Sequence, residues 1–73
     1  MNATFEAAIT KQAIADAKLF CEEFPGQSIS GDWDSEAFSI AMECWDLDEE
    51  DQDLAWDLYR TELHYAVDNA KAK

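Results

Sequence analysis

Apolar residues recur at steps of three and four along most of the chain, which is the period of an α-helix. In the first third, Phe5, Ile9, Ala13 and Phe20 fall on one helical face. No stretch alternates apolar and polar residues, and the β-branched residues that favour strands are few. The pattern therefore predicts an all-α fold without strands.

Two breaks divide this pattern into three predicted helices. The first helix is expected over about residues 4–24, with Asn2 or Thr4 as its cap. Pro25 and Gly26 should end it, because the residue before a proline is disfavoured in the helical conformation and glycine suits the turn that follows.

The sequence signal for the second break, near residues 46–50, is weaker than that for the first. We expect a second helix over about residues 33–46, starting after Asp32, whose side chain can accept a hydrogen bond from a free amide of the first turn. Asp48 is a good cap for a third helix over about residues 49–69. Because residues 46–50 contain neither Gly nor Pro, one continuous helix is the alternative.

Three helices joined by short connections predict a single domain, a small antiparallel three-helix bundle over residues 1–73. In chains this short, the free energy gained by burying apolar surface, about 25 cal/mol per Å², roughly cancels the conformational entropy lost when the residues become ordered. Dimerisation is one remedy, and some of the three Trp, two Tyr and four Phe could lie at a subunit interface. A homodimer is therefore an open alternative.

Negative charge is concentrated in the middle of the chain. The formal net charge is −12, from 17 Asp and Glu against five Lys and Arg. No base lies between Lys18 and Arg60, and thirteen of the acids fall in that stretch. Direct nucleic-acid binding is disfavoured, because phosphate contacts need Lys or Arg. Solubility alone needs a net charge of only about 2–8, so we interpret the excess as a surface that binds a basic protein.

The predicted partner-binding surface combines acids of this stretch with one aromatic residue. Helix-start preferences account for acids in the predicted first turns but not for those further along, such as Asp53. On one continuous helix, four acids would form a row with neighbours about 5–6 Å apart, broadly like the phosphates of a nucleic-acid strand: Asp46, Glu50, Asp53 and Asp57. Trp33 is the candidate hot spot, because an aromatic ring among acids can stack on Arg. The full candidate set is Asp32, Trp33, Asp34, Glu36, Glu43, Asp46, Asp48, Glu49, Glu50, Asp51, Asp53 and Asp57.

Calcium binding is not expected, although acids beginning at Asp32 and at Asp46 are spaced like the start of an EF-hand loop. That loop needs Gly at its sixth position for a sharp turn. The residues at that position are Ala37 and Asp51. We therefore expect no dedicated metal site.

Zinc binding and nucleophilic catalysis are also disfavoured. Cys21, Cys44 and His64 are the only Cys and His residues and lie far apart in the sequence. Both thiols are expected to be buried and reduced among apolar neighbours. His64 has an expected charge partner in Asp68, one turn further along its helix. We expect no cofactor and no enzymatic activity.

No segment approaches the roughly 20 apolar residues of a membrane-spanning helix. Glu6, Lys11 and Asp16 interrupt the apolar residues near the N-terminus, unlike the apolar core of a secretory signal. We therefore expect a cytoplasmic protein that does not contact a membrane.

In size, charge and helicity, the chain resembles the small acidic inhibitors that phages encode, including anti-CRISPR and DNA-mimic proteins. The likeness is one of composition and involves no residue motif. It implies a stoichiometric inhibitor in the host-cell cytoplasm that occupies a basic nucleic-acid-binding surface of a partner protein or complex. The alternatives are a homodimeric helical interaction module, or antitoxin-like adaptor, that uses aromatic surface, and a solvated acidic face without a partner.

Overall fold

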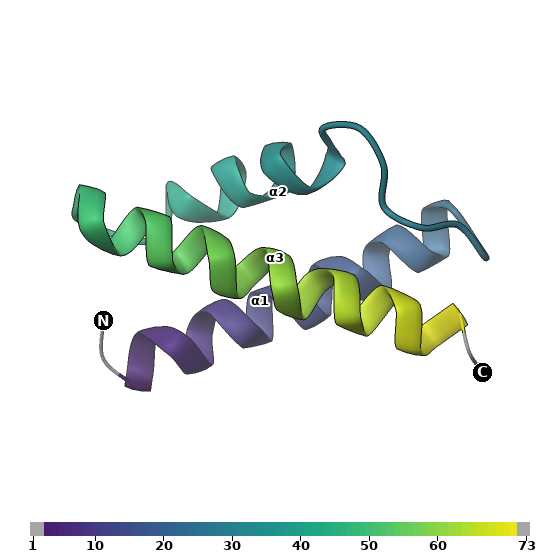
Figure 1. The fold of residues 1–73 in the computed structure, drawn as a ribbon, viewed down its shortest axis with the longest axis horizontal. Helices are drawn as coiled ribbons and strands as arrows, with labels where there is room; N and C mark the ends of the chain where they lie inside the picture. The colour runs from purple at the N-terminus through teal and green to yellow at the C-terminus, as the bar shows by residue number, and fades with distance from the viewer. Residues whose placement is uncertain (1–2, 72–73) are drawn as a thin grey trace.

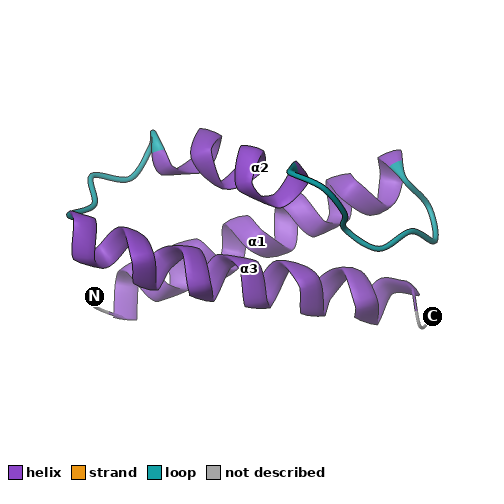
Figure 2. Ribbon diagram, turned by 45° about the horizontal axis from the view of Figure 1, so that its top comes forward, coloured by secondary structure: helices purple, strands orange, loops and turns teal. Residues whose placement is uncertain are grey.

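The computed structural model describes residues 3–71 and contains three helices in them, α1 (Ala3–Glu23), α2 (Trp33–Met42) and α3 (Glu49–Lys71) (Figure 1). Successive helices run in opposite directions, so α1 and α3 point the same way (Figure 2). No strand occurs within the described part of the chain. The prediction of a small all-α three-helix bundle is confirmed.

The main packing seam lies between α1 and α3. Their apolar faces meet there because each helix repeats its apolar residues at the helical period. Ile9 and Ala13 of α1 and Leu63 and Tyr59 of α3 are completely buried. Most of the fully buried side chains therefore belong to these two helices.

The shorter helix α2 is attached to this pair mainly through α3 and through aromatic rings. The ring of Phe38, which is buried, lies 5.2 Å from that of Trp56 and 5.3 Å from that of Tyr59, centroid to centroid. Near the start of α2, the rings of Trp33 and of Phe20 in α1 meet edge to face, with their centroids 5.1 Å apart. These contacts hold both the beginning and the middle of α2.

Two of the expected caps are not formed, by Thr4 at the start of α1 and by the side chain of Asp32 at the start of α2. Thr4 lies inside α1 and is not its cap, and the alternative, Asn2, lies outside the described residues. Asp32 occupies the cap position of α2, but its side chain makes no capping hydrogen bond. Its backbone carbonyl accepts from the amide of Glu36 at 2.9 Å instead. The carboxylate of Asp32 is thus left on the surface.

Helix α2 ends at Met42, four residues before the predicted end, and is separate from α3. After it, the amides of Cys44 and Trp45 bond to carbonyls three residues back, which tightens the chain into a turn. The Trp45 ring that follows lies 6.3 Å from the ring of Phe38, centroid to centroid. The helical pattern that continues through residues 43–46 therefore did not set where the helix ends.

Leu63 and Leu54 provide a matched test of the seam, because both lie on α3 and only Leu63 is buried; Leu54 is 54% exposed. Leu63→Ala should lower the free energy of unfolding by about 2–5 kcal/mol through lost burial and the cavity it leaves. Leu54→Ala should change it by less than about 0.5 kcal/mol. Urea unfolding followed by Trp fluorescence measures both, and equal losses would contradict the assigned core.

Candidate protein-binding surface

At one end of the bundle the chain leaves α2 and enters α3 (Figure 2). The sequence there is strongly acidic. Residues 43–57 contain eight acids and no base. Seven of these acids are exposed, and we call them the acidic junction: Glu43, Asp46, Asp48, Glu49, Glu50, Asp53 and Asp57. The eighth, Asp51, is half-buried among them.

No cation of residues 3–71 forms an ion pair with the acidic junction. The acid–base contacts in that part of the chain join His64 to Asp34 and Lys71 to Asp68. Arg60, the nearest base along α3, makes neither of them. The carboxylates of the junction therefore repel one another and direct a negative potential into solvent.

The predicted row of four acids is not formed, because Asp46 lies in the connection before α3. Glu50, Asp53 and Asp57 do follow one another at three- and four-residue steps on α3, so they share one side of that helix. The junction therefore combines a three-residue row on a helix with acids on the preceding turn.

Three of the remaining acids between Lys18 and Arg60 lie around the start of α2, away from the junction, while Glu22 and Glu23 lie in the last turn of α1. Since α2 has ten residues, its two ends are about 15 Å apart. The candidate residues are therefore divided between two surfaces, and those near the start of α2 are Asp32, Trp33, Asp34 and Glu36.

Asp34 faces inward, and its side chain is only 13% exposed. Its Oδ2 accepts a hydrogen bond from Nε2 of His64 at 3.0 Å. The expected partner of His64, Asp68, instead lies 3.5 Å from Lys71. The prediction for His64 was wrong because helix-surface spacing could not reveal that α2 lies beside this part of α3. Asp34 thus holds two helices together.

Trp33 is also used inside the molecule, although it stays partly accessible. Its ring meets Phe20 edge-on, while Trp56 and Trp45 pack against Phe38. The rings of Trp33 and Trp56 therefore attach α2 to α1 and α3, whereas Trp45 packs on α2 itself. The accessible part of Trp33 lines a groove between α1 and α2.

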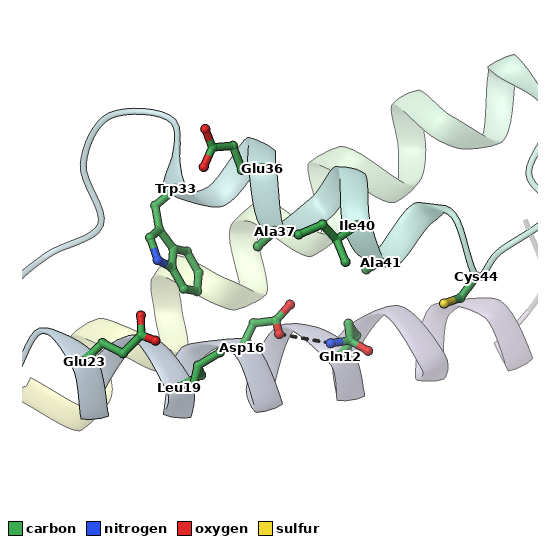
Figure 3. A pocket seen from close by; sticks show the side chains of 10 residues that line it. All are labelled: Gln12, Asp16, Leu19, Glu23, Trp33, Glu36, Ala37, Ile40, Ala41 and Cys44. Atoms are coloured by element: carbon green, nitrogen blue, oxygen red, sulfur yellow. Dashed lines mark hydrogen bonds between the residues drawn. The ribbon is translucent and has the colours of Figure 1, made fainter.

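This groove has a volume of about 410 Å³ and exists because α1 and α2 make little direct contact. On the α2 side, Ala37 and Ala41 are too small to fill the space, and on the α1 side Gln12 and Asp16 are polar (Figure 3). Its lining residues are Gln12, Asp16, Leu19, Glu23, Trp33, Glu36, Ala37, Ile40, Ala41 and Cys44.

A hydrogen-bonded chain connects this groove to the seam below it. The buried hydroxyl of Tyr59 donates to Asp16 Oδ2 at 2.5 Å, and Gln12 Nε2 donates to Asp16 Oδ1 at 3.0 Å. Burial raises the pKa of the Tyr59 phenol above its ordinary value, and the hydrogen bond to Asp16 and the charges of Asp16 and Asp34 raise it further. The sequence signal for this contact, a Tyr on one apolar face and an Asp beside another, was too general to identify the pair.

The cysteines are both free thiols, but they differ from expectation in burial. Cys21 is half-buried, whereas Cys44 is exposed at the end of the groove. The prediction of burial was wrong for Cys44 because α2 ends before it and the following turn directs it outward. Across residues 3–71, no three His, Cys, Asp or Glu side chains are grouped so that they could hold a metal ion.

No helix in the described chain combines the length and apolar character needed to cross a membrane. Comparison with known protein families, with curated proteins and with solved structures found no match. Function must therefore be inferred from the charge and geometry of the chain itself.

Tyr59→Phe should change how stability depends on pH. Above the ordinary phenol pKa of about 10, Tyr59 loses its proton in the unfolded chain but keeps it in the folded chain. Its contribution to the free energy of unfolding therefore falls by about 1.4 kcal/mol for each pH unit above that value. We expect the wild type to be more stable than Tyr59→Phe at pH 7, by about 1 kcal/mol. This advantage should shrink above pH 10.

Urea unfolding of both proteins between pH 7 and pH 11.5 measures this difference. Because the variant retains every other titrating group, their shared pH dependence cancels. Parallel stability curves over the whole range would contradict a buried, hydrogen-bonded phenol.

Proposed function

We propose that the chain is a small inhibitor that occupies a basic nucleic-acid-binding surface of a partner protein or complex. The observation that carries this proposal is the acidic junction, where seven exposed carboxylates lack an ion pair within residues 3–71. Lys and Arg side chains that hold phosphates also bind carboxylates through charge-assisted hydrogen bonds. A partner built to bind nucleic acid is therefore complementary to this surface.

The mechanism is direct occupation. Carboxylates of the junction take the places of phosphates on the partner, with Glu50, Asp53 and Asp57 supplying a short row at helical spacing. The net charge of −12 attracts a basic surface over a distance, which speeds association and makes it sensitive to salt. Such an inhibitor would act in the cytoplasm of the cell that contains its partner.

The packing of the Trp residues against Phe rings of the same chain favours this function over an aromatic interaction module. Trp33, Trp45 and Trp56 are each engaged with a Phe ring of the same chain. The large aromatic side chains that remain exposed are Phe24 and Tyr65. A contact surface dominated by aromatic residues therefore has less support than one dominated by carboxylates.

Charge reversal at the acidic junction should weaken binding to the partner more than reversal elsewhere. We would capture partners from host lysate on the immobilised chain, purify the protein that stays bound, and measure its affinity. The double substitution Asp53→Lys with Asp57→Lys should lower the affinity for this protein at least about tenfold. The matched control, Glu22→Lys with Glu23→Lys, changes the net charge equally at exposed sites in the last turn of α1, outside the junction, and should lower the affinity much less.

Competition and salt complete this test. DNA or RNA that binds the captured protein should displace the chain, and affinity should fall at least about tenfold between about 50 and 300 mM salt. A captured protein without nucleic-acid function, or one that binds both double variants equally, would contradict the proposal. Weak salt dependence together with dimerisation measured by sedimentation would instead support the homodimeric module.

A further inference from the structure

The groove between α1 and α2 exposes apolar surface that the bundle does not use. Ile40, in the middle of its α2 wall, is 70% exposed, and Leu19 of its α1 wall is also exposed. Trp33 lies at one end of the groove and Cys44 at the other (Figure 3). Leaving Ile40 in water forgoes the free energy that its burial would supply.

The polar part of the lining carries one sign of charge. Glu23 and Asp16 come from the α1 wall and Glu36 from the α2 wall, and no Lys or Arg among residues 3–71 lines the groove (Figure 3). An occupant that buries Ile40 and Leu19 would therefore meet a carboxylate on each side. Its complement is an apolar stripe with basic residues along both edges.

The length of the walls fits a helix of about three turns. Gln12 to Glu23 on α1 extends about 17 Å, at 1.5 Å per residue. An amphipathic helix placed along this groove would present apolar residues at steps of three and four to the groove and hold its flanking bases near the acids. We propose that the groove binds a basic amphipathic helix of a partner protein.

A second copy of the chain is a poorer occupant. Its net charge of −12 would be brought against an acidic lining. The bases of α1 are Lys11 and Lys18, and α2 carries none. The groove also differs from the acidic junction, so its proposed occupant does not depend on whether the junction binds a nucleic-acid-binding protein.

A synthetic peptide of 18 residues, with Leu on one helical face and Lys and Arg on the other, tests this inference directly. One control peptide has the same composition in scrambled order, and a second has Glu at each basic position. At about 150 mM salt, calorimetry should show binding of the amphipathic basic peptide at least about tenfold tighter than of either control.

Matched variants locate the binding. Ile40→Gln and Leu19→Gln should each weaken binding of the basic peptide by about tenfold, because they remove apolar contact. Leu54→Gln should have little effect, because Leu54 is exposed on α3 outside the groove. Glu36→Gln should weaken binding several-fold, whereas Glu22→Gln, outside the groove, should not. All five substituted residues are exposed, and circular dichroism checks that each variant folds.

Three results would overturn the inference. Equal binding of the amphipathic and scrambled basic peptides would mean general attraction between opposite charges. Equal effects of Ile40→Gln and Leu54→Gln would place the peptide outside the groove. A dimer in sedimentation that Ile40→Gln converts to a monomer would show that a second copy occupies the groove.

Discussion

The close contact between α1 and α3 is the constraint on which the rest of the molecule depends. Small residues on both helices, Ala13 on α1 and Ala55 on α3, are completely buried and allow the backbones to approach. Tyr59 crosses this seam and satisfies its buried hydroxyl on Asp16, so a polar group is accommodated without an unmade hydrogen bond. The seam thus combines apolar packing with one specific polar contact that fixes how the helices face each other.

Helix α2 is held differently, and this difference creates both candidate surfaces. It is attached by Phe38 and Trp33 and by the contact between Asp34 and His64, while its small residues face α1 across open space. The groove results from that sparse contact. The acidic junction results from the early end of α2, since the chain must then turn through a run of acids before α3 begins. One short helix therefore determines where apolar surface and negative charge are exposed.

Sequence periodicity was sufficient for the fold class because each apolar stripe must be buried against another. It was insufficient where tertiary packing decided the outcome. Trp45 continues the helical pattern of the second helix, yet the chain leaves the helix at Met42 and turns before it. The partner of His64 lies 30 residues away, on another helix, so local spacing identified the wrong acid. The groove was not predicted at all, because alanines such as Ala37 read as ordinary core positions until the distance to the facing helix is known.

Unpaired negative charge and exposed apolar surface both reduce the stability of this domain, and a domain of this size has a small free energy of unfolding. Mutual repulsion among the carboxylates disfavours the compact state, and Ile40 contributes little burial while the groove is open. Small single cores supply only about 3–5 kcal/mol. A partner that brings Lys and Arg, and an apolar stripe, would reduce both costs at once. If the partner binds only the folded chain, it raises the free energy of unfolding by RT ln(1 + [L]/Kd), where [L] is the free partner concentration and Kd its dissociation constant. The same two features that weaken the isolated bundle would therefore favour the proposed complex with a basic partner.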